Sequence, residues 1–266
     1  MKTNFYKNIE RALALKTDKI IAISEQQKYE LTKEFKICSP SRVEVIPLGF
    51  DLSRFNTNKE EKRKNFRNQF NIDDDELAIG IIGRLVPIKN HQLFINAIDS
   101  IRKTSSKKIR AFIVGDGDER ESLKAYSASL GIDYLNGDFS GKEKATLHFT
   151  SWIKEVDIVN AGMDIIALSS LNEGTPVSLI EAQAAGKPIV STNVGGVENI
   201  VIENETALLA PNNDLGAFTS QLSRLVESEA MRETMSQKGW DFVHQQFHFS
   251  RLVDDMKNLY NNLLSS

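Results

Sequence analysis

Short apolar runs alternate with helical stretches along most of this chain, and that alternation limits the folds it can adopt more than any other feature. The runs are apolar at consecutive positions, which is typical of strands buried on both faces of a sheet. Because helical stretches separate most of them, we expect parallel strands with helices on both sides. The candidate strands are residues 19–23, 43–47, 77–83, 109–115, 164–168, 188–191 and 207–210. The prediction is an α/β fold with a doubly wound parallel sheet.

Local signals place several helix starts directly after these strands, where open α/β sheets bind ligands. They consist of a capping residue followed by a residue typical of the first turn. The pairs are Ser24 with Gln27, Asp118 with Glu121, and Thr175 with Pro176. Residues 56–75 are hydrophilic and predict a solvated helix and connector. After residue 213 no strand is apparent, and 215–226, 231–247 and 249–264 are expected to be consecutive amphipathic helices.

Charge and composition argue against several classes of protein. With a net charge of −3 and no long basic run, the chain gives no electrostatic support to a nucleic-acid partner. Its single cysteine excludes a disulfide within the chain. No apolar run approaches the roughly 20 residues of a membrane span, and residues 1–15 are too charged for a signal peptide. We expect a cytoplasmic protein, and peripheral contact with the inner face of the membrane stays open.

Residues 168–196 carry the most chemical information. Glu173 follows a candidate strand, and Glu181 lies about 9 Å along the next helix at ~1.5 Å per residue. The helix start offers free N–H groups to a phosphate, and Gly174 allows close approach of a ligand. Glu181 would then accept hydrogen bonds from two neighbouring hydroxyls, as on a ribose. On spacing alone, the alternative is that Glu173 interacts only with the helix dipole and Glu181 lies on a solvated face.

Residues 81–91 contain a second loop of interest. A candidate strand ends at Gly83, and Arg84 and Lys89 flank Pro87 in the loop that follows. Two cations in one such loop can bind a pyrophosphate, Arg as a planar fork and Lys as a point charge. Taken by itself, this segment favours ordinary surface charges over a pyrophosphate site.

Five segments occur together in a fixed order between residue 18 and about residue 211. They are IPLGFDLSRF (46–55), GRLVPIKNH (83–91), VGDGDER (114–120), EGTPVSLIEAQAAGKPIV (173–190) and NVGGVENIV (193–201). The set resembles glycosyltransferase family 4, a large group of retaining enzymes with the GT-B fold. The resemblance implies that Arg84 and Lys89 neutralise the donor diphosphate without a metal, and that Glu173 lies near the transferred sugar. These three are the implied catalytic residues.

The resemblance also implies a donor-binding set. Glu181 matches the glutamate that binds the nucleotide ribose, and Gly174 and Thr175 match backbone contacts to sugar and phosphate. Trp152 and Ile153 fall near the family's base-binding loop. The full implied set is Gly83, Arg84, Lys89, Trp152, Ile153, Glu173, Gly174, Thr175 and Glu181.

The same resemblance implies a domain organisation. Residues 43–247 would form the Rossmann-like, nucleotide-sugar-binding C-terminal domain, and 248–266 its crossover helix. Residues 1–42 would be a remnant of an acceptor-side N-terminal domain that is otherwise missing, on the order of ~150 residues. We therefore expect this chain alone to be inactive, unless a partner chain supplies that domain.

Other motifs have weaker interpretations. Asp116 and Asp118 match the D-x-D metal site of GT-A transferases, but a strand-to-helix turn produces the same spacing. Gly115 and Gly117 match part of a dinucleotide fingerprint, but Arg120 stands where its third glycine belongs. The neighbouring glycines 195–196 predict a turn with positive φ. His244 and His248 adjoin Phe247 and Phe249, which favours packing over a metal site.

The sequence thus predicts a retaining glycosyltransferase. It would transfer a hexosyl unit from a nucleoside diphosphate sugar, with a UDP-sugar favoured, to a hydroxyl of a carbohydrate or lipid-linked acceptor. The process would be polysaccharide or glycoconjugate synthesis, and no cofactor is expected. Two alternatives stay open. One is a non-catalytic sugar-nucleotide-binding fragment or subunit of a split transferase, and the other is a metal-dependent GT-A transferase.

Overall fold

The computed structural model describes residues 2–137 and 143–265. Its contacts divide the chain into a smaller unit, Met1–Asp51 with His244–Ser266, and a larger unit, Leu52–Val243. The sequence led us to expect boundaries after residues 42 and 247 instead. The first boundary differs because residues 43–45 pair with an earlier strand of the smaller unit.

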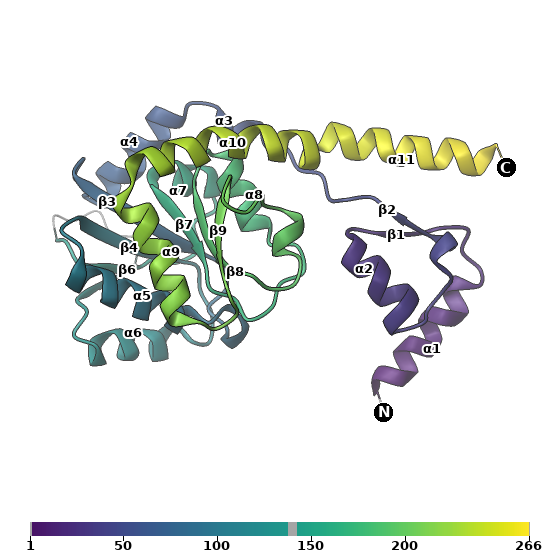
Figure 1. The fold of residues 1–266 in the computed structure, drawn as a ribbon, viewed down its shortest axis with the longest axis horizontal. Helices are drawn as coiled ribbons and strands as arrows, with labels where there is room; N and C mark the ends of the chain where they lie inside the picture. Colours follow the sequence, from purple (N-terminus) through teal and green to yellow (C-terminus); the bar gives the residue numbers. More distant parts are fainter. Residues whose placement is uncertain (1, 138–142, 266) are drawn as a thin grey trace. The chain divides into compact units, whose positions relative to one another are not determined.

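The larger unit contains a seven-stranded sheet in the order β5-β6-β4-β3-β7-β8-β9 (Figure 1). All neighbouring strands are parallel, which confirms the predicted α/β fold. In the centre, Gly80 of β3 lies opposite Phe112 of β4 and Ile166 of β7. The strands are β3 (Glu76–Ile82), β4 (Lys108–Val114), β5 (Tyr134–Asn136), β6 (Leu147–Phe149), β7 (Ile165–Leu168), β8 (Ile189–Thr192) and β9 (Ala207–Ala210).

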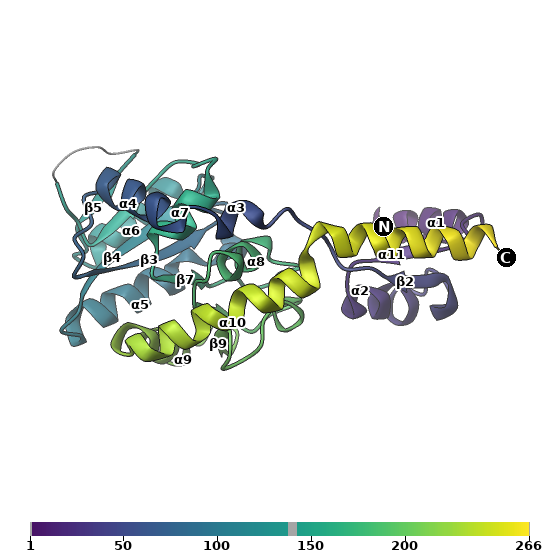
Figure 2. The same cartoon turned by 90° about the horizontal axis from the view of Figure 1, so that it is seen from above.

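Helices cover both faces of this sheet (Figure 2). On one face α5 packs against α6 and α9, where Phe94, Leu123 and Phe218 are fully buried. On the other face α4 packs along α7, and α3 and α8 lie beside them. The helices are α3 (Ser53–Asn56), α4 (Lys59–Gln69), α5 (His91–Thr104), α6 (Arg120–Ser129), α7 (Val156–Gly162), α8 (Val177–Ala184), α9 (Leu215–Glu227) and α10 (Glu229–Phe247). The prediction of a solvated helix over 56–75 was wrong for one face of α4, because Phe66 is buried against Phe112.

The strand order defines where a ligand crevice can form. From β3 the chain passes to β4 and then to the edge strand β5, and β6 next fills the position between β5 and β4; the chain then crosses to the other side of β3 as β7. The sheet therefore reverses its winding between β3 and β7. In open parallel sheets, ligands bind beyond the carboxyl ends of the strands at such a switch point. The loops after β3 and β7 are the two that carry the predicted Arg84, Lys89 and Glu173.

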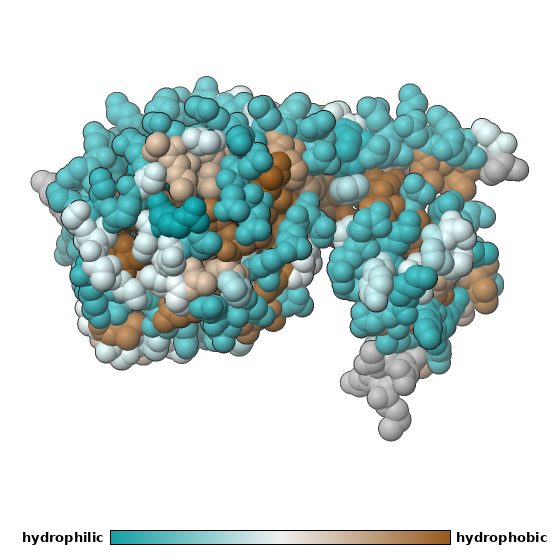
Figure 3. All heavy atoms as spheres, in the orientation of Figure 1, coloured by the Kyte–Doolittle hydropathy of each residue, from teal (hydrophilic) through white to brown (hydrophobic). Residues whose placement is uncertain are grey.

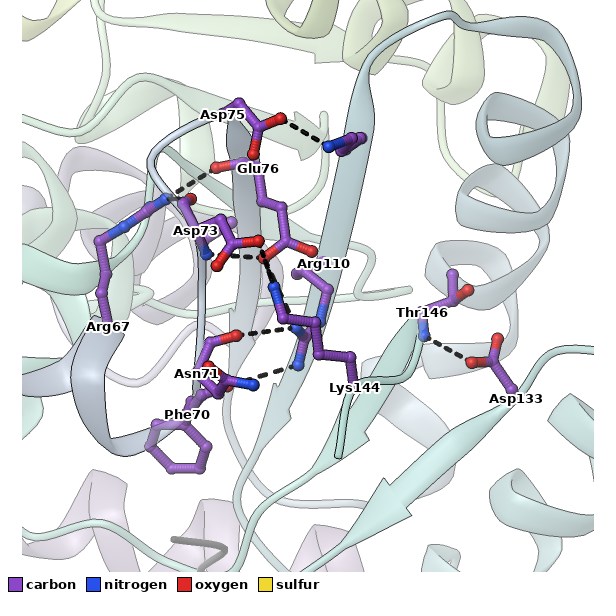
Figure 4. A network of polar contacts seen from close by, with 12 residues as sticks. Arg67, Phe70, Asn71, Asp73, Asp75, Glu76, Arg110, Asp133, Lys144 and Thr146 are labelled. Atoms are coloured by element: carbon purple, nitrogen blue, oxygen red, sulfur yellow. Dashed lines mark hydrogen bonds and ion pairs between the residues drawn. The ribbon is translucent and has the colours of Figure 1, made fainter. Parts of the chain in front are cut away.

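At the amino ends of β3 and β4, charged side chains form a network of hydrogen bonds and ion pairs (Figure 4). Buried Glu76 at the start of β3 accepts a hydrogen bond from Lys144 at 3.0 Å and lies 3.6 Å from Arg110. Arg67 donates to the Glu76 carbonyl at 2.9 Å, and Asp75 pairs with Lys108 at 2.6 Å. Among the described residues each of these charged groups has a partner of opposite charge, so the network stabilises this end of the sheet.

The smaller unit is built around two parallel strands, β1 (Ile20–Ala22) and β2 (Val43–Val45). Its other elements include α1 (Lys2–Ala14), α2 (Glu25–Tyr29), a π-helical turn (Glu30–Glu34), a 3₁₀ turn (Pro40–Arg42) and α11 (Phe249–Leu264). Ser24 accepts a hydrogen bond from the Gln27 amide at 3.1 Å, which confirms the predicted helix start. Arg251 of α11 donates to the carbonyls of Pro47 and Leu48 at 2.7 Å. The helix is thereby tied to the segment after β2.

Among its described residues, the smaller unit exposes more large apolar side chains than it buries. Figure 3 shows hydrophobic residues, in brown, on the visible surface of this unit. The buried apolar residues are Ala14, Ala22, Ile37, Val43, Ile46, Phe247 and Leu259. The exposed large ones are Phe5, Tyr6, Ile9, Leu13, Leu15, Ile21, Tyr29, Phe249, Val253, Tyr260 and Leu264. A two-stranded parallel sheet with so small a core is not expected to be stable by itself. No helix in the described residues is long and apolar enough to span a membrane.

Candidate functional site

The loops after β3 and β7 lie side by side at the carboxyl edge of the sheet. The Ser169 hydroxyl donates to the Lys89 carbonyl at 2.9 Å, and the Leu171 amide donates to the Ile88 carbonyl at 2.8 Å. These bonds hold together two segments that the sequence analysis selected separately. The cations of one loop and the glutamate of the other thus share one site.

Lys89 and Glu173 form an ion pair in this site. The Lys89 Nζ atom lies 2.5 Å from the Glu173 carboxylate, and both side chains are mostly buried. The Ser170 hydroxyl donates a hydrogen bond to the same carboxylate oxygen at 2.6 Å. The Thr192 hydroxyl in turn donates to the Ser170 carbonyl at 2.6 Å. Glu173 is therefore fixed from two sides. Ser170 was absent from the predicted site, although its place three residues before Glu173 in the same loop was visible in the sequence.

Arg84 differs from Lys89 in its surroundings. Its side chain is exposed, and its guanidinium makes no hydrogen bond or ion pair with the part of the chain that the structure describes. Lys89 ends a 3₁₀ turn over Pro87–Lys89, and Asn90 then adopts a left-handed conformation at φ 48° to start α5. Of the two predicted cations, Lys89 is neutralised by Glu173, and Arg84 is unpaired within residues 2–137 and 143–265.

A third loop holds the backbone of Glu173 and Gly174 in place. Gly195 has φ +52°, as predicted for this turn, and the Gly196 amide donates to the Glu173 carbonyl at 3.1 Å. A Cβ atom on Gly196 would lie 1.8 Å from the Gly174 carbonyl oxygen. Only glycine allows the two loops to approach so closely.

We expect Gly196→Ala to destabilise the larger unit by about 1–3 kcal/mol, the usual cost of overpacking. The displaced Glu173 loop should also bind a nucleoside diphosphate more weakly. Denaturant unfolding and calorimetric titration measure the two effects. Gly216→Ala in α9 is the matched control, because its new Cβ would meet no atom closer than 3.5 Å. If both variants have the same free energy of unfolding as the wild type, Gly196 does not lie as close to the Gly174 carbonyl as described.

The start of α8 differs from the prediction by one residue. Thr175 and Pro176 were expected as N-cap and first helical residue, whereas Pro176 is the N-cap and the helix begins at Val177. The expected cap at Asp118 is also wrong, because α6 begins at Arg120 after Glu119. Gly174 is exposed, and a side chain there would meet nothing within 4 Å. The segment before α8 is therefore open to a ligand.

Glu181 lies four residues into α8 and is largely buried, with 19% of its side chain exposed. Its carboxylate accepts no hydrogen bond from the described residues, and its one ion pair is a long one, 3.8 Å to Arg54 of α3. Burial raises the pKa of this carboxyl, while Arg54 lowers it and Asp157 raises it further. A buried carboxylate without donors is unfavourable. Glu181 is therefore suited to accept hydrogen bonds from a ligand.

Trp152 and Ile153 lie in the loop after β6. Trp152 is exposed, and both residues line a pocket of about 400 Å³ together with Phe66 of α4 and Ile158 of α7. No hydrogen bond or ion pair within the described residues joins them to the Lys89–Glu173 pair. A pocket of about 470 Å³ in the smaller unit, between β2 and α11, contains none of the predicted residues.

The D-x-D motif and the two glycines beside it lie in a turn, and the two histidines pack against each other. Asp116 accepts a hydrogen bond from the Gly117 amide at 2.8 Å, as in a turn, and a Cβ on Gly115 would meet the Gly83 carbonyl at 2.0 Å. The His244 and His248 rings lie 4.8 Å apart, and His248 also packs on Phe249. Among the described residues, no three His, Cys, Asp or Glu side chains lie close enough together to hold a metal ion.

Comparison with known proteins identifies the family. The sequence pattern of the glycosyl transferases group 1 matches residues 62–241. An Escherichia coli protein named as a UDP-Gal:alpha-D-GlcNAc-diphosphoundecaprenol alpha-1,3-galactosyltransferase is 27% identical over 264 residues. That alignment covers 97% of this chain and 64% of the relative, so the chain spans less than two thirds of the relative's length.

Solved structures agree on the fold. A glycosyltransferase from Rickettsia africae superposes with a TM-score of 0.81 at 18% identity, covering 98% of this chain and 67% of that one. HepE from Anabaena, solved with UDP and also with UDP-glucose, superposes with a TM-score of 0.77 at 19% identity, covering 94% and 64% in its complex with UDP. Since the family pattern covers more than half of the chain and includes the loops of the candidate site, this protein belongs to the glycosyl transferases group 1 family.

Proposed function

We propose that the chain binds a nucleoside diphosphate sugar and, as part of a retaining glycosyltransferase, supplies the donor half of the active site. One observation carries this proposal. At the carboxyl ends of β3 and β7, the loop that carries Arg84 and Lys89 pairs with Glu173, and the helix after Glu173 carries Glu181, a largely buried carboxylate that accepts no hydrogen bond from the described residues. Hydroxyl groups of a ribose match the Glu181 carboxylate, and a diphosphate matches the two cations.

The proposed chemistry is electrostatic. The bond between the anomeric carbon and the diphosphate breaks, an acceptor hydroxyl oxygen forms the new bond on the same face of the sugar, and the hydroxyl proton passes to an oxygen of the departing diphosphate. Arg84 and Lys89 would stabilise the charge that develops on the leaving diphosphate, so the proposal requires no metal. The Lys89 ammonium has three N–H donors, and its contact with Glu173 uses one of them, which leaves two for the diphosphate. Glu173, held by Ser170, then lies beside the reacting sugar.

The proposed donor is a UDP-sugar. Support comes from HepE, whose structures contain UDP and UDP-glucose. The proposed acceptor is a hydroxyl of a carbohydrate or a lipid-linked carbohydrate, in polysaccharide or glycoconjugate synthesis. Calorimetric titration with UDP-, GDP- and ADP-sugars tests donor binding, and binding of none of them contradicts the proposal.

We expect Glu181→Ala to weaken UDP binding by roughly 1.5–3 kcal/mol, the scale of hydrogen bonds to a charged acceptor. A 2′,3′-dideoxy nucleotide should lose similar affinity for the wild type and much less for the variant. Calorimetry of the four combinations measures this coupling. Equal losses for both proteins would exclude Glu181 as the ribose ligand.

We further propose that transfer requires an additional α/β domain, in the same polypeptide or in a partner chain. The smaller unit supports this, because its exposed apolar helix and two-stranded sheet would be buried by such a domain. A chain that binds the sugar nucleotide without ever transferring it is the competing function. The transfer assay described in the Discussion separates the two.

A further inference from the structure

The surroundings of Glu181 include an arginine with no role in the prediction. Arg54 belongs to α3, which packs beside α8, and its guanidinium approaches the Glu181 carboxylate to 3.8 Å. About half of the Arg54 side chain is exposed. Its guanidinium also lies 4.9 Å from the centre of the Phe55 ring, and Phe55 is buried. Arg54 is thus held beside Glu181 while one side of it faces solvent.

A second ion pair fixes the backbone of Arg54. Lys62 of α4 donates to the Arg54 carbonyl at 2.5 Å and pairs with Asp157 of α7 at 2.9 Å. Lys62 and Asp157 are both largely buried. We call Arg54, Lys62, Asp157 and Glu181 the charge cluster. It joins four helices and contains two positive and two negative groups.

The pairing within the charge cluster assigns one cation to each carboxylate. Lys62 pairs with Asp157, and Arg54 is the cation of the cluster that pairs with Glu181. At 3.8 Å the Arg54–Glu181 contact is an ion pair without a hydrogen bond. Arg54 therefore contributes positive charge and leaves the acceptor positions of the Glu181 oxygens unoccupied. That is the arrangement a carboxylate needs when its hydrogen bonds are reserved for a ligand.

We propose that Arg54 is a positioning residue for the donor: it balances and orients Glu181 while both carboxylate oxygens stay available to the ribose hydroxyls. This inference rests on the proposed function of the site. It goes further by assigning a role to α3, which overlaps the 46–55 motif. The sequence analysis gave no role to any single residue of that motif.

The pH dependence of nucleotide binding follows from this arrangement. The ionised carboxylate makes the stronger hydrogen bonds to hydroxyls, so affinity should fall as the pH falls through the pKa of Glu181. Burial and Asp157 raise that pKa, and Arg54 opposes them. Removing Arg54 raises the pKa further, so the loss of affinity should begin at a higher pH. A residue that only supported α3 would weaken binding equally at every pH.

The test is calorimetric titration with UDP, and with GDP and ADP in parallel, from about pH 4.5 to about pH 8. For Arg54→Gln the pH at which affinity is half lost should move upward by about one unit, because the partner charge is gone. Arg54→Lys should restore most of the wild-type profile. Glu181→Gln should bind weakly without this titration. Lys64→Gln, which removes an exposed cation from α4, is the matched control and should leave the profile unchanged.

A second measurement needs no nucleotide. Carbon-13 NMR of the Glu181 carboxyl should show a higher pKa in Arg54→Gln than in the wild type. Unchanged titration, or nucleotide binding weakened equally at all pH values, overturns the role of Arg54 while leaving the proposed function standing. Absence of UDP, GDP and ADP binding by the wild type overturns the proposed function itself, whatever the NMR titration shows.

Discussion

The purified chain should bind a nucleoside diphosphate sugar and transfer the sugar at a negligible rate until a second α/β domain is supplied. In the proposed function, Arg84, Lys89 and Glu181 bind the diphosphate and ribose of the donor, and the additional domain orients the acceptor hydroxyl. Orientation of two reactants accounts for factors on the order of 10⁵ or more in rate. A comparable loss is therefore expected in its absence.

The decisive measurement is a transfer assay with and without an added domain. Candidates for the added domain are the polypeptide encoded directly upstream and the part of the E. coli relative that this chain does not match. Donor binding should be similar with and without the added domain, while sugar transfer should appear only when the domain is present. A Leu13→Glu substitution on the exposed face of α1 should prevent the rescue and leave donor binding intact. Efficient transfer by the chain alone contradicts the prediction.

The second large effect concerns the two cations. Replacing both Arg84 and Lys89 by glutamine should weaken UDP binding by roughly 3–6 kcal/mol, taking about 1.5–3 kcal/mol for each charged hydrogen-bond donor. Uridine, which lacks the diphosphate, should bind the variant and the wild type alike. Calorimetry with UDP, UMP and uridine measures the contrast.

The single variants separate the contributions of the two cations. Arg84→Gln removes an exposed and unpaired group, so its effect on UDP reports the phosphate contact directly. Lys89→Gln also leaves Glu173 without its ion pair, so part of its effect reflects the altered carboxylate. Lys64→Gln controls for the loss of a positive charge elsewhere. Equal weakening of uridine and UDP would show that the pair does not bind the diphosphate.

The central strands could be predicted because their apolar runs are long and buried. β5 and β6 were missed because each has only three residues and neither is a plain apolar run. In β6 the middle residue is His148, which is buried by stacking on Phe112 and by a contact to the Gly137 carbonyl at 2.7 Å. Those neighbours come from distant segments, so local pattern alone does not reveal the strand.

The candidate site, like the sheet, could be predicted only in part. Its loops could be predicted, because motif residues follow strand ends and parallel strands end at one edge. The pairing of Lys89 with Glu173, 84 residues apart, depends on β7 lying beside β3, which spacing does not determine. The Arg54–Glu181 contact likewise requires α3 to pack beside α8. The missing hydrogen bonds of Glu181 are a property of the packed structure and leave no trace in the sequence.

The smaller unit has a consequence for the order of events during synthesis. Its segments come from the two ends of the chain: the Phe50 amide donates to the Phe247 carbonyl at 2.8 Å, and the Phe249 amide donates to the Phe50 carbonyl at 3.0 Å. On the ribosome, residues 1–51 emerge first and must wait for α11, while the intervening larger unit can fold as soon as it has emerged. During that interval the carbonyls of Pro47 and Leu48 lack the Arg251 guanidinium that they accept hydrogen bonds from in the finished chain. Chaperones should therefore bind residues 43–51 of nascent chains until α11 is complete.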